Sequence, residues 1–166
     1  MHLVIDGYNL IHQSPELFAA HDRGGGREAL AAALKLYRQK RGHRFTVVFD
    51  GGPEGGPSRA TLSGVPVIYS GAEVSADQVI VELARQAGEG LTVITDDRQL
   101  GEYCRQRGAE VIPARTFAAR LMETAQGGKG GGEEEGEGWD FSTRKKGPSR
   151  REPKARRRQA RRLEKL

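Results

Sequence analysis

The sequence contains very few of the features on which several common protein classes depend. Cys104 is its only cysteine, which excludes a disulfide framework and a metal site built from several thiolates. No apolar run approaches the roughly 20 residues of a membrane-spanning helix. The first residues also lack the basic start and long apolar run of a signal peptide. We therefore expect a cytoplasmic protein without a membrane segment.

Motifs for binding nucleotides and organic cofactors are missing as well. The chain has no GxxxxGK[ST] phosphate loop, and Gly24–Gly26 does not follow an expected strand as a dinucleotide-binding turn would. Its four histidines show no spacing typical of metal ligands, so we interpret them as structural or surface residues. The sequence gives no sign of an organic cofactor.

Charge is distributed unevenly along the 166 residues, whose net charge is +5. Residues 1–124 hold 14 Lys and Arg against 15 Asp and Glu, whereas residues 125–166 hold 13 against 7. The first part is nearly neutral and the second is strongly basic. A basic tail on a neutral domain indicates a polyanionic partner, with RNA as the first candidate.

This division predicts three segments. Residues 1–124 are expected to form one domain, residues 125–142 a flexible Gly/Glu-rich linker, and residues 143–166 a basic tail that is disordered or becomes helical on binding. The linker and the tail are both too polar to fold alone.

The basic tail holds 12 Lys and Arg against 2 Glu. Such a segment binds RNA phosphates without reading sequence and with strong salt dependence. The tail residues that we expect to contact RNA are Arg156, Arg157 and Arg158. The alternative is a solvated tail without a ligand.

Short apolar runs alternate with amphipathic stretches over residues 1–124. The expected strands are residues 2–5, 45–49, 66–69, 91–95 and 109–112. The expected helices are residues 27–41, 76–87, 98–107 and 115–124. Residues 51–64 are expected to form a loop because they are rich in Gly and Pro. The alternation predicts an α/β fold, with a parallel sheet of about five strands and helices on both faces.

Aspartates follow several of the expected strands. Asp6 comes directly after the first strand, Asp50 after the second, and Asp96 and Asp97 at the end of the run LTVIT. Because the carboxyl ends of parallel strands share one edge of a sheet, these side chains are expected to meet there.

A fifth aspartate, Asp77, lies at the start of an expected helix, where Ser75 and Gln78 match a capping box. Each aspartate alone has an ordinary explanation as a helix cap or turn residue, and Asp96 with Gln99 fits a cap. Together, however, crowded carboxylates repel one another unless a cation neutralises them. An all-oxygen site indicates Mg²⁺ or Mn²⁺ rather than zinc.

An acidic site for a hard ion is typical of phosphate chemistry, since the ion can activate a water and stabilise a leaving oxygen. Two other phosphate-handling classes fit poorly. A haloacid-dehalogenase-type phosphatase needs a second Asp two residues after the first, where this chain has Tyr8. A response-regulator receiver needs a Lys after its last strand, where residues 113–116 are PART.

Four motifs in order resemble one known family. They are DGYN at 6–9, FDG at 49–51, EVSAD at 73–77 and TDD at 95–97. Together they resemble the NYN domains of the PIN-like nuclease superfamily, and within it the YacP-like group of bacterial ribosome-associated endoribonucleases. The resemblance covers residues 1 to about 123.

The resemblance implies a PIN-like three-layer sandwich and a metal-dependent endoribonuclease that cuts single-stranded RNA, with mRNA on the ribosome as an expected target. By position, Asp6, Asp77 and Asp97 match the family's acidic metal ligands, and Asp50 and Asp96 are expected to assist them. Asn9 matches an asparagine expected to orient a ligand or hold the scissile phosphate. The alternative for Asn9 is a buried amide that ties the 6–9 loop.

Side chains near the expected edge are candidates for contacts with RNA. Tyr8 could stack on a base or pack into the core, and Arg59 and Arg98 could hold phosphates. Arg23 and Arg27 could do the same if the loop before the first long helix folds over the site. The alternative function is a non-catalytic RNA- or ribosome-binding module, in which the aspartates hold a structural ion or none.

Overall fold

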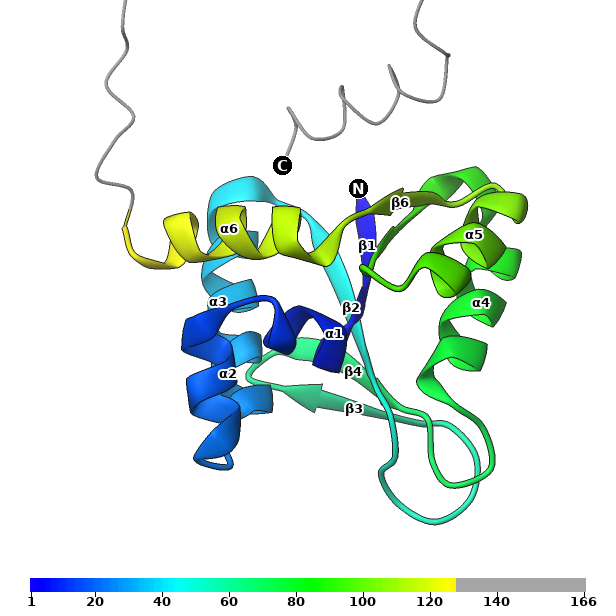
Figure 1. The fold of residues 1–166 in the computed structure, drawn as a ribbon, viewed down its shortest axis with the longest axis horizontal. Helices are drawn as coiled ribbons and strands as arrows, with labels where there is room; N and C mark the ends of the chain where they lie inside the picture. The colour runs from blue at the N-terminus through cyan, green and yellow to red at the C-terminus, as the bar shows by residue number, and fades with distance from the viewer. Residues whose placement is uncertain (128–166) are drawn as a thin grey trace, which may run out of the picture.

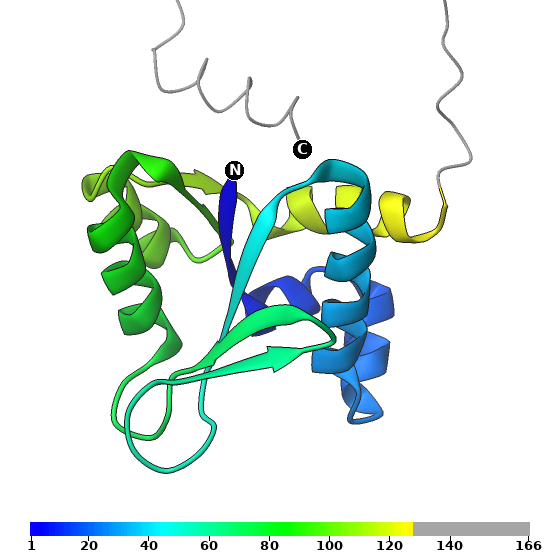
Figure 2. The same cartoon turned by 180° about the vertical axis from the view of Figure 1, so that it is seen from behind.

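The computed structural model describes residues 1–127, which form a six-stranded sheet between two layers of helices (Figures 1 and 2). The strands are β1 (His2–Asp6), β2 (Arg44–Phe49), β3 (Ser58–Leu62), β4 (Val65–Tyr69), β5 (Leu91–Ile94) and β6 (Glu110–Ile112). The helices are α1 (Gly7–His12), α2 (Pro15–Asp22), α3 (Gly26–Arg41), α4 (Ala76–Ala87), α5 (Arg98–Gln106) and α6 (Ala114–Ala125), with a 3₁₀ turn, η1 (Gly88–Gly90). The predicted basic tail and nearly all of the predicted linker lie outside the described residues.

The sheet has the strand order β3-β4-β2-β1-β5-β6. All neighbouring strands are parallel except β3, which runs antiparallel to β4 at one edge. β5 is buried along its whole length, as expected for a parallel strand covered on both faces. The predicted α/β sandwich is therefore confirmed.

Two hydrophobic clusters fill the space between the layers. One lies under α1, α2, α3 and α6 and includes Leu34 and Phe117, both fully buried. The other lies under α4 and α5 and includes Ile80 and Cys104, also fully buried. Figures 1 and 2 show the two groups of helices on opposite sides of the sheet. The carboxyl edge between these layers is where β1, β2 and β5 end.

The structure differs from the sequence prediction in three elements. The expected loop 51–64 contains a sixth strand, β3, which consists of exposed and half-buried residues. It forms by pairing with β4 through a tight turn in which Ser63 and Gly64 have φ values of 50° and 81°. The short helices α1 and α2 were not predicted either. Asp6 caps α1, and Ser14 followed by Pro15 begins α2.

Gly7 allows α1 to lie directly on the end of β2. A Cβ atom at this position would lie 2.3 Å from Cε1 of Phe49. Because only glycine avoids this collision, the residue after Asp6 can turn at once into a helix. The close approach holds Asp6 near the carboxyl end of the neighbouring strand.

Among residues 1–127, no helix is both long enough and apolar enough to cross a bilayer.

Candidate functional site

Three helix starts bring acidic side chains to the carboxyl edge of the sheet. Asp6 is the N-cap of α1, and its Oδ1 accepts a hydrogen bond of 3.2 Å from the Asn9 amide. Asp97 is the N-cap of α5, and its Oδ1 accepts one of 2.8 Å from the Leu100 amide. Asp77 lies in the first turn of α4. Aspartate is favoured at all three places because it satisfies free N–H groups and the positive end of the helix dipole.

The pKa of Asp6 reflects both its burial and the other acidic residues near it. The pKa of Asp6 is raised to about 6, mainly by partial burial and also by the charges of Asp77 and Asp97, although hydrogen bonds from Asn9 and Thr95 oppose the rise. Burial raises the pKa of Asp77 in the same direction, with further contributions from Asp97 and Asp50. Four carboxylates therefore repel one another at this edge.

These charges are not neutralised within the described chain. In residues 1–127, no Lys or Arg forms an ion pair with Asp6, Asp77 or Asp97. A crowded set of unpaired oxygen donors is the chemistry that suits a hard divalent ion. No three His, Cys, Asp or Glu side chains of residues 1–127 already stand in an arrangement that would hold an ion. Asp77 is exposed, so its side chain can rotate toward Asp6 without disturbing the core, whereas Oδ1 of Asp97 is held by the cap of α5 and leaves Oδ2 for an ion.

Asp50 connects three elements beside the cluster. Its Oδ1 accepts a hydrogen bond of 3.0 Å from the Ala76 amide at the start of α4 and one of 3.1 Å from the Ser70 hydroxyl after β4. The Ser70 oxygen also accepts from the Gly51 amide at 2.9 Å. Asp50 therefore fixes the start of the helix that carries Asp77. Sequence reasoning missed Ser70, because no motif marks a serine after a strand.

Asn9 and Thr95 tie α1 to the loop between β5 and α5. The Asn9 side-chain oxygen accepts a hydrogen bond of 2.9 Å from the Asp96 amide. The Thr95 hydroxyl donates to Oδ2 of Asp6 at 3.4 Å and accepts from the Asp97 amide at 3.1 Å. The amide oxygen of Asn9 therefore binds the loop before α5 rather than the 6–9 loop of the structural alternative, and its expected role in orienting a ligand or holding the scissile phosphate stays a prediction. Thr95 belonged to a recognised motif, but nothing in its position along the chain indicated this role.

Unlike Asp6, Asp77 and Asp97, Asp96 contacts an arginine within residues 1–127. Its Oδ2 accepts a hydrogen bond of 3.0 Å from the Arg115 amide, and its Oδ1 lies 3.9 Å from Nε of Arg115. The interpretation of Asp96 as the cap of α5 was wrong, because Asp97 occupies that position. The assisting metal-ligand roles expected of Asp96 and Asp50 stay predictions.

A cleft of about 730 Å³ opens next to Asp97, between α5 and the junction of β6 with α6. Its wall includes three arginines, Arg98, Arg105 and Arg115, together with acidic residues. Arg98 was predicted to face this edge. Arg105 was missed, although it follows Arg98 by seven residues and so shares a face of α5. Arg59 does not line this cleft; it belongs to strand β3, where it pairs with Ile68 near the carboxyl end of β4, and its contact with phosphate stays a prediction.

Tyr8 packs against neighbouring side chains on the α3 side of the carboxyl edge. Its ring meets that of Phe49 edge-on at a centroid distance of 5.1 Å and that of His21 at 5.7 Å. Its hydroxyl accepts a hydrogen bond of 3.0 Å from Nε of Arg27. The packing alternative for Tyr8 is therefore what the structure contains, and base stacking on Tyr8 stays a prediction.

Three further predicted RNA contacts belong to the basic tail. They concern residues that lie outside the described part of the chain, namely Arg156, Arg157 and Arg158. Their roles therefore stay predictions, and the site described above is built from residues 1–127 alone.

Comparisons of the sequence and the fold with known proteins find one matching family and similar solved structures. The sequence model of the YacP-like NYN domain matches residues 3–166. The fold is similar to that of Rae1 (YacP) from Bacillus subtilis, with 26% identity, a TM-score of 0.61 and 76% of each chain covered. A mutant form of that protein gives 25% identity and a TM-score of 0.63, covering 75% of this chain and 77% of that chain. No curated protein matches the sequence.

Proposed function

The chain belongs to the family of YacP-like NYN domains, and from this premise we propose that it is a metal-dependent endoribonuclease acting on single-stranded RNA. Family membership and the structural neighbours indicate a nuclease-type, RNA-related function. The observation that carries the finer proposal is the group of unpaired, mutually repelling carboxylates of Asp6, Asp77 and Asp97.

Asp6, Asp77 and Asp97 would hold Mg²⁺ or Mn²⁺ in this proposal. Such an ion, when bound, supplies Lewis acidity toward a phosphate oxygen and lowers the pKa of a coordinated water. The donor set supports this assignment because it consists of oxygen atoms only and its crowding disfavours the metal-free state.

The neighbouring residues keep the three acids in place and hold the strand. Asp50 anchors the first residue of α4, and Asn9 anchors the loop before Asp97. Arg98, Arg105 and Arg115 line the adjacent cleft, where guanidinium groups would contact backbone phosphates without reading sequence. The RNA would therefore be held from the α5 side while its phosphodiester lies over the carboxylates.

The test compares cleavage of a panel of single-stranded RNAs by wild type, Asp6→Asn and Asp77→Asn in Mg²⁺ or Mn²⁺. Asparagine caps a helix about as well as aspartate, so Asp6→Asn retains the start of α1 while removing a negative charge. We expect each variant to lose roughly 100-fold or more of the cleavage rate, in line with the loss of one transition-state-stabilising group. Equal cleavage by all three proteins contradicts the proposal.

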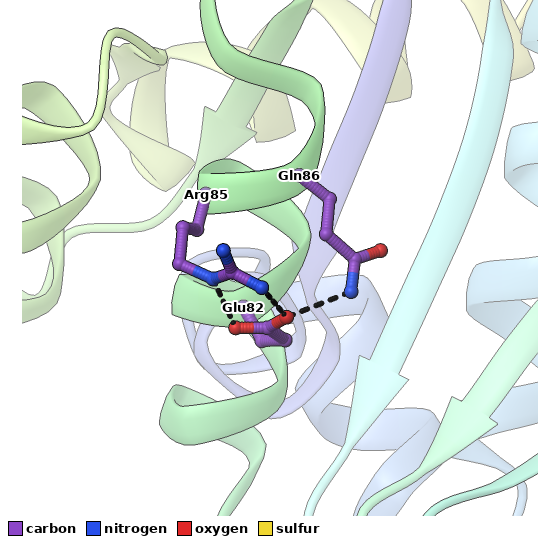
Figure 3. A network of polar contacts seen from close by, with 3 residues as sticks. All are labelled: Glu82, Arg85 and Gln86. Carbon is purple, nitrogen blue, oxygen red and sulfur yellow. Dashed lines mark hydrogen bonds and ion pairs between the residues drawn. The ribbon is translucent and has the colours of Figure 1, made fainter.

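Glu82→Gln is the matched control. Glu82 lies on α4 like Asp77, and both its carboxylate oxygens accept hydrogen bonds of 2.7–2.8 Å from Arg85 and Gln86 (Figure 3). The substitution changes one charge on the same helix but leaves the carboxyl edge untouched. We expect Glu82→Gln to cleave RNA like wild type.

One observation favours a second candidate, a non-catalytic RNA- or ribosome-binding module. Within residues 1–127, no three potential ligands are already arranged around an ion. This module would bind RNA equally well after Asp6→Asn or Asp77→Asn and would cut none.

As part of the first proposal, we also infer that the target is mRNA on the ribosome. Cosedimentation of the protein with purified ribosomes, followed by mapping of cut sites in translated mRNA, tests that inference.

A further inference from the structure

Arg27 occupies an unusual position near the start of α3. Its guanidinium carbon lies 5.7 Å from the ring centroid of Tyr8, 5.7 Å from that of Phe49 and 5.5 Å from that of Tyr69. The three rings come from three different elements, α1, β2 and β4. A guanidinium within about 6 Å of a ring face is attracted to it, so these contacts restrict where the charged end of Arg27 can lie.

Hydrogen bonds add to this restraint. Nε of Arg27 donates to the Tyr8 hydroxyl at 3.0 Å. Burial would lower the pKa of Arg27, but hydrogen bonds to the phenol groups of Tyr69 and Tyr8 outweigh it, so the pKa is raised. The group is held in place by aromatic neighbours and stays charged at any physiological pH.

The charge of Arg27 is not neutralised by an acidic side chain within residues 1–127. In residues 1–127, no Asp or Glu forms an ion pair with it, and the residue is exposed. A guanidinium has five N–H donors, of which the two phenols take at most a part. The remaining donors form a planar fork that matches two oxygens of a phosphate.

The aromatic residues also place Arg27 at the acidic edge. Tyr8 follows Asp6 by two residues, Phe49 precedes Asp50, and Tyr69 precedes Ser70. Tyr8, Phe49 and Tyr69 pack with the cluster under α1, α2 and α3, whereas Asp77 and Asp97 begin the helices that cover the other face. Arg27 therefore lies on the face of the sheet that α3 covers, whereas Arg98 and Arg105 of the cleft belong to α5 on the opposite face.

We propose that Arg27, fixed by Tyr8, Phe49 and Tyr69, is a phosphate-binding residue that holds the RNA backbone on the α3 side of the carboxylates. A strand crossing the edge would then be held on both sides of the point where it is cut. This inference rests on the proposed function only in taking single-stranded RNA as the ligand. It assigns Arg27 to binding and not to the chemical step.

Binding is measured by fluorescence anisotropy with the full chain and a labelled single-stranded oligoribonucleotide in EDTA, which prevents metal-dependent cleavage. Arg27→Met retains an unbranched apolar stem and removes the charge. We expect about a tenfold loss of affinity, typical of a charge-assisted hydrogen-bonded contact. The slope of log affinity against log salt concentration should also become shallower by about 0.7, the value for one phosphate contact in a single strand.

Arg41→Met is the matched control. Arg41 is an exposed arginine at the far end of the same helix, about 21 Å from Arg27 at a rise of 1.5 Å per residue. We expect its affinity to stay within twofold of wild type. Arg27→Lys keeps a point charge without the planar fork, so it should lose part of the affinity while its salt slope stays near that of wild type.

An oligonucleotide of the same length without bases separates phosphate binding from base stacking. If Arg27 contacts phosphate, Arg27→Met weakens binding to the abasic strand by the same factor as to the normal strand. Three results would overturn the proposal: unchanged affinity and slope in Arg27→Met, an equal loss in Arg41→Met, or a loss confined to the strand with bases. A protein that binds RNA through Arg27 but cuts none in Mg²⁺ or Mn²⁺ would keep this inference and lose the proposed nuclease activity.

Discussion

Among single residues, Asp6 shows how burial and neighbouring acidic residues change the pKa of a side chain in the site. Its pKa is raised to about 6 by burial and by the charges of Asp77 and Asp97, while the unfolded chain titrates near 3.8. Between these values the folded protein binds more protons than the unfolded one. The contribution of Asp6 to the free energy of unfolding therefore decreases as the pH rises from about 4 to about 6 and stays low above it.

This leads to a pH prediction for the metal-free protein. The stability difference between Asp6→Asn and wild type, measured by thermal unfolding in EDTA, should favour the variant increasingly from pH 4 to pH 7. A shift from 3.8 to about 6 corresponds to roughly 3 kcal/mol at most. Parallel stability curves for the two proteins would contradict this. Saturating Mg²⁺ should reverse the order at pH 7, because wild type alone retains the full ligand set.

Several residue roles could be predicted from the sequence, and others could not. Asp6, Asp77 and Asp97 were expected together because strand ends and helix starts share an edge in a parallel sheet. The choice of Asp97 as the cap of α5 depends on where β5 ends, which differs by a single residue from the expected strand. The role of Ser70 could not be predicted from the sequence, because it depends on the pairing of β2 with β4, which brings Ser70 next to Asp50.

Among the elements, the start of α4 determines the position of Asp77. The predicted capping box is confirmed: the Ser75 hydroxyl accepts from the Gln78 amide at 3.2 Å, and the Gln78 side chain accepts from the Ser75 amide at 2.9 Å. Together with Asp50, which accepts from Ala76, these bonds hold the first turn in which Asp77 lies.

Ser75→Ala tests this arrangement. We expect it to lower the free energy of unfolding by about 1 kcal/mol, as for other lost N-caps. RNA cleavage should fall by more than the small unfolded fraction accounts for, because the first turn frays and Asp77 loses its fixed position. Ser75→Thr, which can still cap, should restore both properties. Denaturant unfolding and cleavage assays on the three proteins measure the effects, and a stability loss without any change in cleavage would show that the cap does not position Asp77.

Elements with strong apolar patterns were predictable, and the missed elements lack such patterns. The runs FTVVF and LTVIT become β2 and β5 with small shifts of their bounds. β3 has no buried residue, so nothing in its sequence separates it from a loop until β4 offers a partner. α1 has only six residues, too short for helical periodicity to show.

At the scale of the whole molecule, both core clusters are formed by residues between Leu3 and Leu121. The basic segment 143–166 holds 12 Lys and Arg against 2 Glu. This segment lies outside the described residues, so its role in RNA binding stays a prediction.

Deletion of residues 143–166 should leave the thermal unfolding temperature unchanged, because both core clusters described in residues 1–127 are retained. RNA affinity should fall and its salt dependence should become shallower, by up to about 0.7 in slope for each lost phosphate contact. The cleavage rate at saturating RNA should match that of the full chain, so the effect appears in KM. If affinity is unchanged, the tail has no part in RNA binding.

The central place of β1 has a consequence for how the domain matures during its synthesis. β1 is made first, yet its neighbours on the two sides begin near Arg44 and Leu91. A nascent chain that ends before Leu91 lacks β5, one of the two strands that pair with β1, and it also lacks Asp97. Asp6 then lies at the end of a strand that is unpaired on one side. Pairings between segments so distant in the chain form slowly. The acidic edge is therefore completed only after most of the domain has been translated, and a partly made chain lacks the full set of carboxylates.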